Sequence, residues 1–305
     1  ILLCQNKAID VIVEATGEVE FGSKVVLEAI KNKKHVCLIN AELDSTLGPI
    51  LKRYADRNGV IYTQADGDQP AVMMNLFREV KLMGFKPVMV GNIKSLLDHY
   101  RTPLTQLNWA NEHFQRPKMV TSFADGTKIS FENASVANAT GFKVGKRGMF
   151  GPKAEFVMEA VNLFPLKKHL KQGLVDYILG AEPSFGIFVI GYSKDKVLQK
   201  YMSVYKMGEG PFYVFYRPFH LSPLEAPKSV ARAYLFKDPT LSPMGKSFCD
   251  VITVAKKDLK KGEILDGIGG FTCYGVIENT DTLLKERLLP MGLSDGCILK
   301  KDAAK

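Results

Sequence analysis

Residues 10–40 have the sequence DVIVEATGEVEFGSKVVLEAIKNKKHVCLIN, in which two short apolar runs flank a helical stretch. The runs, at 10–15 and 35–40, are mainly apolar, as expected for strands buried on both faces of a parallel sheet. Between them, residues 21–32 carry apolar side chains at helical spacing. This order predicts a βαβ unit, from which parallel α/β sheets are built.

The alternation continues, with helices predicted at 47–58 and 70–83 and strands at 60–63 and 87–91. We therefore predict that residues 1–91 form the C-terminal half of a Rossmann-type, doubly wound α/β sheet. The sequence begins inside this pattern with Ile1, and it contains no G-x-G-x-x-G phosphate loop. We interpret the N-terminus as a truncation and expect this chain on its own to bind a dinucleotide poorly.

The remaining residues follow a different pattern. Residues 92–250 combine long loops with helices and strands, which predicts an α+β catalytic or substrate domain. Its helices are expected at 125–138 and 154–164, and its strands at 186–191 and 212–216. Residues 251–305 contain short apolar runs separated by glycines, which predicts a small β module.

Composition supports a multidomain chain with a small-molecule ligand. The 305 residues are 46% hydrophobic and 24% charged, which is enough to bury the cores of two or three domains. The formal net charge is +9, but basic residues occur as scattered pairs such as Lys33-Lys34 and Lys260-Lys261. Because no basic stripe forms, we expect a small anionic substrate or cofactor and no nucleic acid.

Cysteine usage and hydropathy argue against several other classes. The five cysteines are odd in number and contain no C-x-x-C pair, so we predict neither a disulfide framework nor a metal site. No apolar run approaches the ~20 residues that a membrane-spanning helix needs. Nothing near the start resembles a charged leader followed by an apolar stretch. We therefore expect a cytoplasmic protein without membrane contact.

Small and polar residues follow the first two predicted strands, as Glu14-Ala15-Thr16-Gly17 and Asn40-Ala41-Glu42. Open α/β sheets bind ligands at the carboxyl ends of their strands, and small residues there let the backbone approach a cofactor ring. We predict that the cofactor is bound by Glu14, Ala15, Thr16, Gly17, Asn40 and Glu42. The alternative is an ordinary strand-to-helix turn in which Thr16 caps the helix.

The stretch Asp66-Gly67-Asp68-Gln69-Pro70 lies between a predicted strand and a predicted helix. It brings two carboxylates and a carboxamide to the ligand edge of the sheet. A helix start also explains part of it, because Asp68 can cap the helix with Pro70 in the first turn. Asp66 and Gln69 then remain free to face the cleft.

Two lysines are candidate catalytic residues. Lys94 follows the predicted strand at 87–91, although a lone lysine is usually a solvated surface residue. Lys128 and Glu132 are four residues apart and share a helix face, either as a surface pair or as a catalytic pair. The nearly uncharged residues 134–141 favour a buried helix, in which a lysine pKa falls and the side chain can shuttle protons. Asp125 and Asn138 lie at the ends of this predicted helix.

A cation and an imidazole occur together in Tyr216-Arg217-Pro218-Phe219-His220. Arg217 could hold a carboxylate or phosphate in a bidentate manner. His220 either binds substrate or is a core histidine that the backbone satisfies.

Taken together, these motifs resemble the homoserine-dehydrogenase-like oxidoreductases that carry a C-terminal SAF domain, a group that includes a deoxyxylulose phosphate reductoisomerase-like enzyme. The resemblance covers essentially the whole chain. Its motifs are residues 14–17, 40–42, 48–51, 66–70, 125–128 and 216–220, together with a SAF-like β-clip segment at 255–293. The missing phosphate loop and the region 141–210 depart from the family pattern.

The resemblance implies an enzyme that transfers a hydride between NAD or NADP and a small hydroxy or keto compound, such as a sugar-derived or polyol phosphate. Lys128 would be the general acid/base or carbonyl polariser, and Glu132 would orient it. Lys94 and Asp66 would complete the catalytic set. The substrate would be bound by Asp68, Gln69, Asp125, Asn138, Arg217 and His220.

Two alternatives stay open at this point. The first is homoserine dehydrogenase itself, which needs carboxylates placed for the substrate ammonium group. The second is a non-catalytic sugar-binding or scaffold protein that functions through its SAF module. Homo-oligomers are the general expectation for such enzymes.

Overall fold

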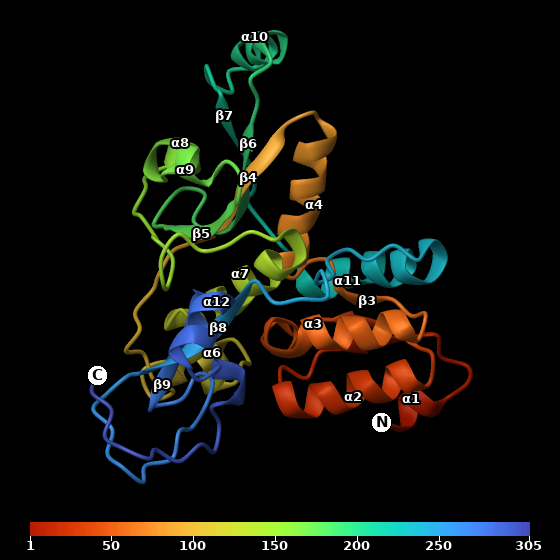
Figure 1. The fold of residues 1–305 in the computed structure, drawn as a ribbon, viewed down its shortest axis with the longest axis vertical. Coiled ribbons are helices and arrows are strands. Elements are labelled where there is room, and N and C mark those ends of the chain that lie inside the picture. The colour runs from red at the N-terminus through yellow and green to blue at the C-terminus, as the bar shows by residue number, and fades with distance from the viewer.

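The computed structural model describes residues 1–305, which form three separate sheets (Figure 1). The first sheet is parallel, with the order β1 (Val11–Glu14), β2 (His35–Leu38) and β3 (Tyr62–Gln64). Helix α2 (Val19–Lys31) connects β1 to β2, and the short α1 (Leu2–Gln5) packs against α2. The predicted βαβ unit is therefore confirmed.

Helix α3 (Ala41–Arg57) begins six residues before the predicted start. The reason is a cap, because the side chain of Asn40 accepts a hydrogen bond from the Leu43 amide at 3.0 Å. Glu42 consequently lies in the first turn of a helix and not in a loop.

Strand β4 (Lys86–Lys94) follows α4 (Gln69–Leu82) and belongs to the second sheet. The second sheet has the order β5-β4-β6-β7, with β5 (Leu174–Leu179), β6 (Gly186–Tyr192) and β7 (Phe212–Arg217). Only β4 and β5 pair in parallel. The prediction that residues 87–91 continue the first sheet is therefore wrong, and the predicted domain boundary after residue 91 falls within β4. An apolar run predicts a strand but does not identify its partner.

Gly91 in β4 is closely packed by two other strands. A Cβ atom added there would lie 2.6 Å from the Asp176 carbonyl oxygen and 2.7 Å from a ring carbon of Phe188. We expect Gly91→Ala to lower the free energy of unfolding by about 1–3 kcal/mol through overpacking. Urea denaturation measures this, and a variant as stable as the parent would contradict the close packing.

Helix α7 (Thr127–Thr140) is buried along most of its length and lies near the centre of the molecule (Figure 1). It packs against α3, α4, β8 and β9. The shorter α5 (Leu107–Glu112) and α6 (Pro117–Ala124) precede it. The predicted buried helix at 125–138 is thus confirmed.

The helix predicted at 154–164 is broken into short pieces. These pieces are the 3₁₀ turn η1 (Val157–Glu159) and α8 (Ala160–Leu163), and a separate α9 (Leu166–His169) follows Pro165. Later in the chain come α10 (Lys196–Val204), α11 (Ser222–Ala231) and the π-helical turn η2 (Arg232–Phe236).

The C-terminal segment contains one antiparallel ribbon, β8 (Cys249–Ala255) with β9 (Cys273–Asn279). It also contains α12 (Thr280–Glu286) and the turn η3 (Met291–Leu293), so it is not purely β structure. The SAF assignment and the three domain ranges stay predictions. No helix of the protein combines the length and the apolar character needed to cross a bilayer.

Candidate active site

The carboxyl ends of β1 and β2 are joined by a polar network. The Glu14 carboxylate accepts hydrogen bonds from the Thr16 amide at 2.8 Å and from the Thr16 hydroxyl. Its second oxygen accepts from the Asn40 side chain at 2.9 Å. Gly17 ends the turn with a φ of 72°, a left-handed conformation that glycine adopts without steric cost. Four of the predicted cofactor residues thus lie side by side at the predicted edge.

Lys128 of α7 points to this edge and forms an ion pair with Glu42, with 3.0 Å between Nζ and Oε2. Glu132, which was predicted to orient Lys128, forms no ion pair with it, although its charge also raises the Lys128 pKa. Glu132 instead accepts a hydrogen bond from Asn92 of β4 at 3.1 Å. Helical spacing identifies neighbours on α7 but not Glu42, which is 86 residues earlier in the chain.

The carboxylates around Lys128 keep its side chain protonated. Burial by itself would lower the pKa of Lys128, but the surrounding carboxylates, Glu42 foremost, outweigh burial and raise that pKa. The ammonium group is therefore retained at any physiological pH.

Lys94, at the end of β4, is in the opposite situation. Burial lowers its pKa, and this outweighs the opposing influence of the Glu132 and Asp125 carboxylates. Burial also raises the pKa of Glu132 to about 8. Lys94 and Glu132 are thus a neighbouring base and acid that both exchange protons more readily near neutrality than their ordinary values allow.

The two aspartates after β3 have different surroundings, and neither makes the predicted helix cap. The Asp66 carboxylate accepts a hydrogen bond from Asn75, and the charges that act on it are those of Lys228, Arg232 and Glu225, not that of Lys128. Asp68 is the N-cap residue of α4 but makes no side-chain cap bond. Its buried Oδ2 has no hydrogen-bond partner, and its charge acts on both Lys128 and Glu132. Asp68, and not Asp66, therefore belongs to the cluster.

Gln69 and His220, predicted to bind substrate, contact each other. The side-chain nitrogens Nε2 of Gln69 and Nε2 of His220 are 2.8 Å apart. The amide oxygen of Gln69 accepts a hydrogen bond from Asn92. Both residues are thus part of an internal network, and Asn92 is a site residue that the sequence analysis missed. A lone asparagine inside an apolar strand was the available signal.

Two other predicted substrate residues, Asp125 and Asn138, make structural contacts. Asp125 caps the Thr127 amide at 2.9 Å and pairs with the buried Lys256 at 2.8 Å. Asn138 accepts hydrogen bonds from the amides of Phe248 and Cys249 at the start of β8. These contacts hold both side chains against neighbouring segments, although the charge of Asp125 also acts on Lys94.

Arg217 is also engaged within the protein. Its guanidinium pairs with Glu225 and stacks on Phe219, with 4.3 Å to the ring centroid. Because a carboxylate already occupies the guanidinium, the predicted anion-binding role is not supported. No group of three or more His, Cys, Asp or Glu side chains is arranged to hold a metal ion.

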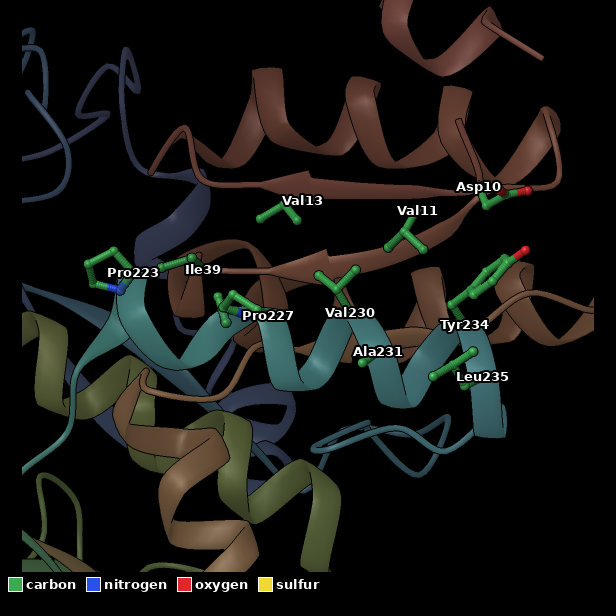
Figure 2. Close-up of a pocket in the computed structure, with 11 residues that line it drawn as sticks. Asp10, Val11, Val13, Ile39, Pro223, Pro227, Val230, Ala231, Tyr234 and Leu235 are labelled. Carbon is green, nitrogen blue, oxygen red and sulfur yellow. The ribbon is translucent and has the colours of Figure 1, made fainter. Parts of the chain in front are cut away.

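A separate groove lies on one face of the first sheet. Figure 2 shows Val11 and Val13 of β1 facing Pro227 and Val230 of α11. Most of its lining is apolar, and its ionisable side chains are Asp10 and Tyr234, so it brings no cation together with a carboxylate. The polar cluster around Lys128 is therefore the candidate active site.

Comparison with protein families finds an oxidoreductase family. The sequence model described as "Oxidoreductase DRL, catalytic domain" matches residues 67–226, slightly more than half of the chain. No curated protein matches the chain.

Three solved structures are similar. A probable dehydrogenase from Thermotoga maritima is 13% identical, with 79% of this chain and 74% of that chain covered and a TM-score of 0.42. A homoserine dehydrogenase from S. aureus is 14% identical over 95% and 81%, with a TM-score of 0.39. A homoserine dehydrogenase from Thiobacillus denitrificans is 14% identical over 80% and 66%, with a TM-score of 0.37.

Proposed function

Because this chain belongs to the family of the oxidoreductase DRL catalytic domain, we propose that it transfers a hydride between NAD or NADP and a small hydroxy or keto compound, such as a sugar-derived or polyol phosphate. The observation that carries this proposal is the cluster of Lys128, Lys94 and Glu132 beside the carboxyl edge of a parallel sheet. Ligands of open α/β folds bind at that edge.

The cofactor would lie against the turn after β1. Ala15 and Gly17 leave room for a ring to approach the backbone, and Gly17 already has the conformation of a tight turn. These residues and Asn40 fit the nicotinamide end of such a cofactor. When bound, it would supply or accept the hydride.

The two lysines would have different roles in this reaction. Lys128, whose charge Glu42 holds in place, would polarise the substrate oxygen and stabilise negative charge that develops there. Lys94 would remove the hydroxyl proton during oxidation and return it during reduction. Glu132 would share that proton with Lys94.

The test is a fluorescence titration of the protein with NADH and NADPH, extended to high cofactor concentrations because this chain on its own is expected to bind a dinucleotide weakly. Turnover assays on hydroxy-acid and keto-sugar phosphate panels follow at the highest cofactor concentration. Binding of one cofactor together with hydride transfer to a panel member is the expected result. If neither cofactor binds and no panel member reacts, the proposal is rejected. A non-catalytic binding or scaffold role would then take its place.

A second candidate substrate class is an amino alcohol such as homoserine. The observation in its favour is Asp68, whose free carboxylate oxygen could accept hydrogen bonds from a substrate ammonium group. Turnover of amino alcohols but not of phosphorylated sugars would select this class.

Lys94→Met is expected to lower kcat by about 10²- to 10⁴-fold, the usual contribution of a general acid/base. The parent enzyme should gain oxidation activity with rising pH as Lys94 loses its proton, because only the neutral amine accepts one. Burial lowers the Lys94 pKa, so this rise should be complete below the ordinary range of a lysine. The variant should lose that limb of the pH profile.

Lys86→Met is the matched control, since Lys86 is exposed at the other end of β4. Its pH profile should equal that of the parent enzyme. A Lys94→Met variant that keeps the basic limb would remove Lys94 from proton transfer.

A further inference from the structure

A chain of side-chain hydrogen bonds begins at His220, just before α11. Its Nδ1 lies 2.9 Å from the carbonyl oxygen of Gly67. A carbonyl oxygen only accepts, so Nδ1 must carry the imidazole proton. Nε2 is then an acceptor, and its contact with Gln69 Nε2 at 2.8 Å requires Gln69 to be the donor. The tautomer of His220 thus fixes the orientation of the Gln69 amide.

The chain continues from Gln69 to Glu132. The Gln69 oxygen accepts from Asn92 Nδ2, which also donates to Glu132 Oε2 at 3.1 Å. The Asn92 oxygen accepts from Asn133 at 2.7 Å. Every amide in the chain therefore has a single orientation that satisfies all of its neighbours.

We propose that Gln69 and Asn92 are positioning residues, which form a relay from His220 to Glu132 and keep the proton of Glu132 on Oε1. The direction of the Asn92 hydrogen bond determines which Glu132 oxygen can carry the proton. Because Asn92 presents N–H to Oε2, a proton on that oxygen would face another donor. When Glu132 is protonated, the proton must sit on Oε1, the oxygen that Asn92 does not bind. There it is free for exchange with substrate or lysine.

The charged groups around His220 and Glu132, the two ends of the chain, are compatible with these hydrogen-bond directions. Asp68, Glu225 and Arg217 face His220, and the ring of Phe185 stacks on it with 4.4 Å between centroids. Burial is the largest influence on His220 and lowers its pKa, so the neutral tautomer persists at and above neutral pH. The charges around Glu132 are Lys128, Asp68, Lys94 and Glu42.

The test is NMR of the whole protein with ¹⁵N-labelled histidine, asparagine and glutamine, and it requires no substrate. Ionisation of Glu132 strengthens its bond to Asn92. The nitrogens of Asn92, Gln69 and His220 should therefore shift together near the Glu132 pKa of about 8, although His220 itself is already neutral there. Glu132→Gln should abolish all three shifts. His113, exposed and stacked on Trp109, is the internal control and should not respond.

Asn92→Leu distinguishes transmission along the hydrogen-bond chain from a direct electrostatic effect of the Glu132 charge on His220. It breaks the chain but leaves the Glu132 charge in place, so the His220 shift near pH 8 should disappear. If the shift persists in Asn92→Leu, or is absent from the parent protein, the proposal is overturned. If Asn92→Leu does not fold, Gln69→Met interrupts the same chain one residue further on, and the same two outcomes decide.

The inference rests on the proposed function only where Glu132 exchanges its proton with substrate. The two can fail separately. A concerted shift without any hydride transfer leaves the relay intact and rejects the oxidoreductase assignment. Turnover without a concerted shift supports the oxidoreductase assignment and rejects the relay.

Discussion

Lys128→Met is expected to lower kcat by about 10²- to 10³-fold, because it removes the fixed positive charge that would stabilise the substrate oxygen. It should also lower the free energy of unfolding by about 3 kcal/mol, since Glu42 is left as an unpaired carboxylate in a mostly buried position. Steady-state kinetics on the substrate found by the panels measures the first effect, and urea denaturation measures the second.

A double variant separates these two effects. Glu42→Gln combined with Lys128→Met removes both members of the ion pair, so much of the lost stability should return. Turnover should not return, because the charge at position 128 is still missing. If activity recovers together with stability, Lys128 has a structural and not a catalytic role.

The first part of the fold could be predicted because its signals are local. The apolar runs at 10–15 and 35–40 and the helix between them lie within one βαβ unit, and each pattern is visible in a short window. Strand β4 could not be assigned to its sheet, because its partners β5 and β6 come about eighty or more residues later. A strand pattern carries no information about such distant pairing.

In the candidate site, too, local features could be predicted and contacts between distant segments could not. Lys128 could be predicted because it lies on a helix of small, uncharged residues, which indicates burial. Its partner Glu42 could be placed at the strand edge but not paired with Lys128, since the pairing depends on how α7 crosses that edge. Asp66 and Asp68 are two residues apart, and only the structure decides which one faces the cluster.

Lys256→Met is expected to lower the free energy of unfolding by about 3–5 kcal/mol, as breaking a buried ion pair does. The side chains of Lys256 and Asp125 are 3% and 0% exposed, and their charged atoms are 2.8 Å apart. Lys256 also donates to the carbonyl oxygens of Arg101 and Gly270. Methionine would leave the buried Asp125 carboxylate unpaired and would remove the donor from both carbonyl oxygens. Urea denaturation measures the loss.

The neighbouring Lys257 provides the matched control. Its side chain is 55% exposed and pairs with Glu263 at the surface, so Lys257→Met should cost less than about 1 kcal/mol. Equal losses in the two variants would show that the buried Lys256 pair stabilises the protein no more than the surface pair of Lys257. Adding Asp125→Asn to Lys256→Met should restore part of the stability, because the amide oxygen can still cap Thr127.

This ion pair also connects the C-terminal segment to the active site. Asp125 lies two residues before Thr127, the first residue of α7, and its side chain accepts a hydrogen bond from the Thr127 amide. The Thr127 hydroxyl accepts a hydrogen bond from the Gly275 amide of β9 at 2.8 Å. Lys128 is the next residue. Loosening the Lys256 contact should therefore displace the N-terminus of α7 and lower kcat even under conditions in which the protein remains folded. Lys256→Met that loses stability but keeps full turnover would show that α7 holds Lys128 without help from the C-terminal segment.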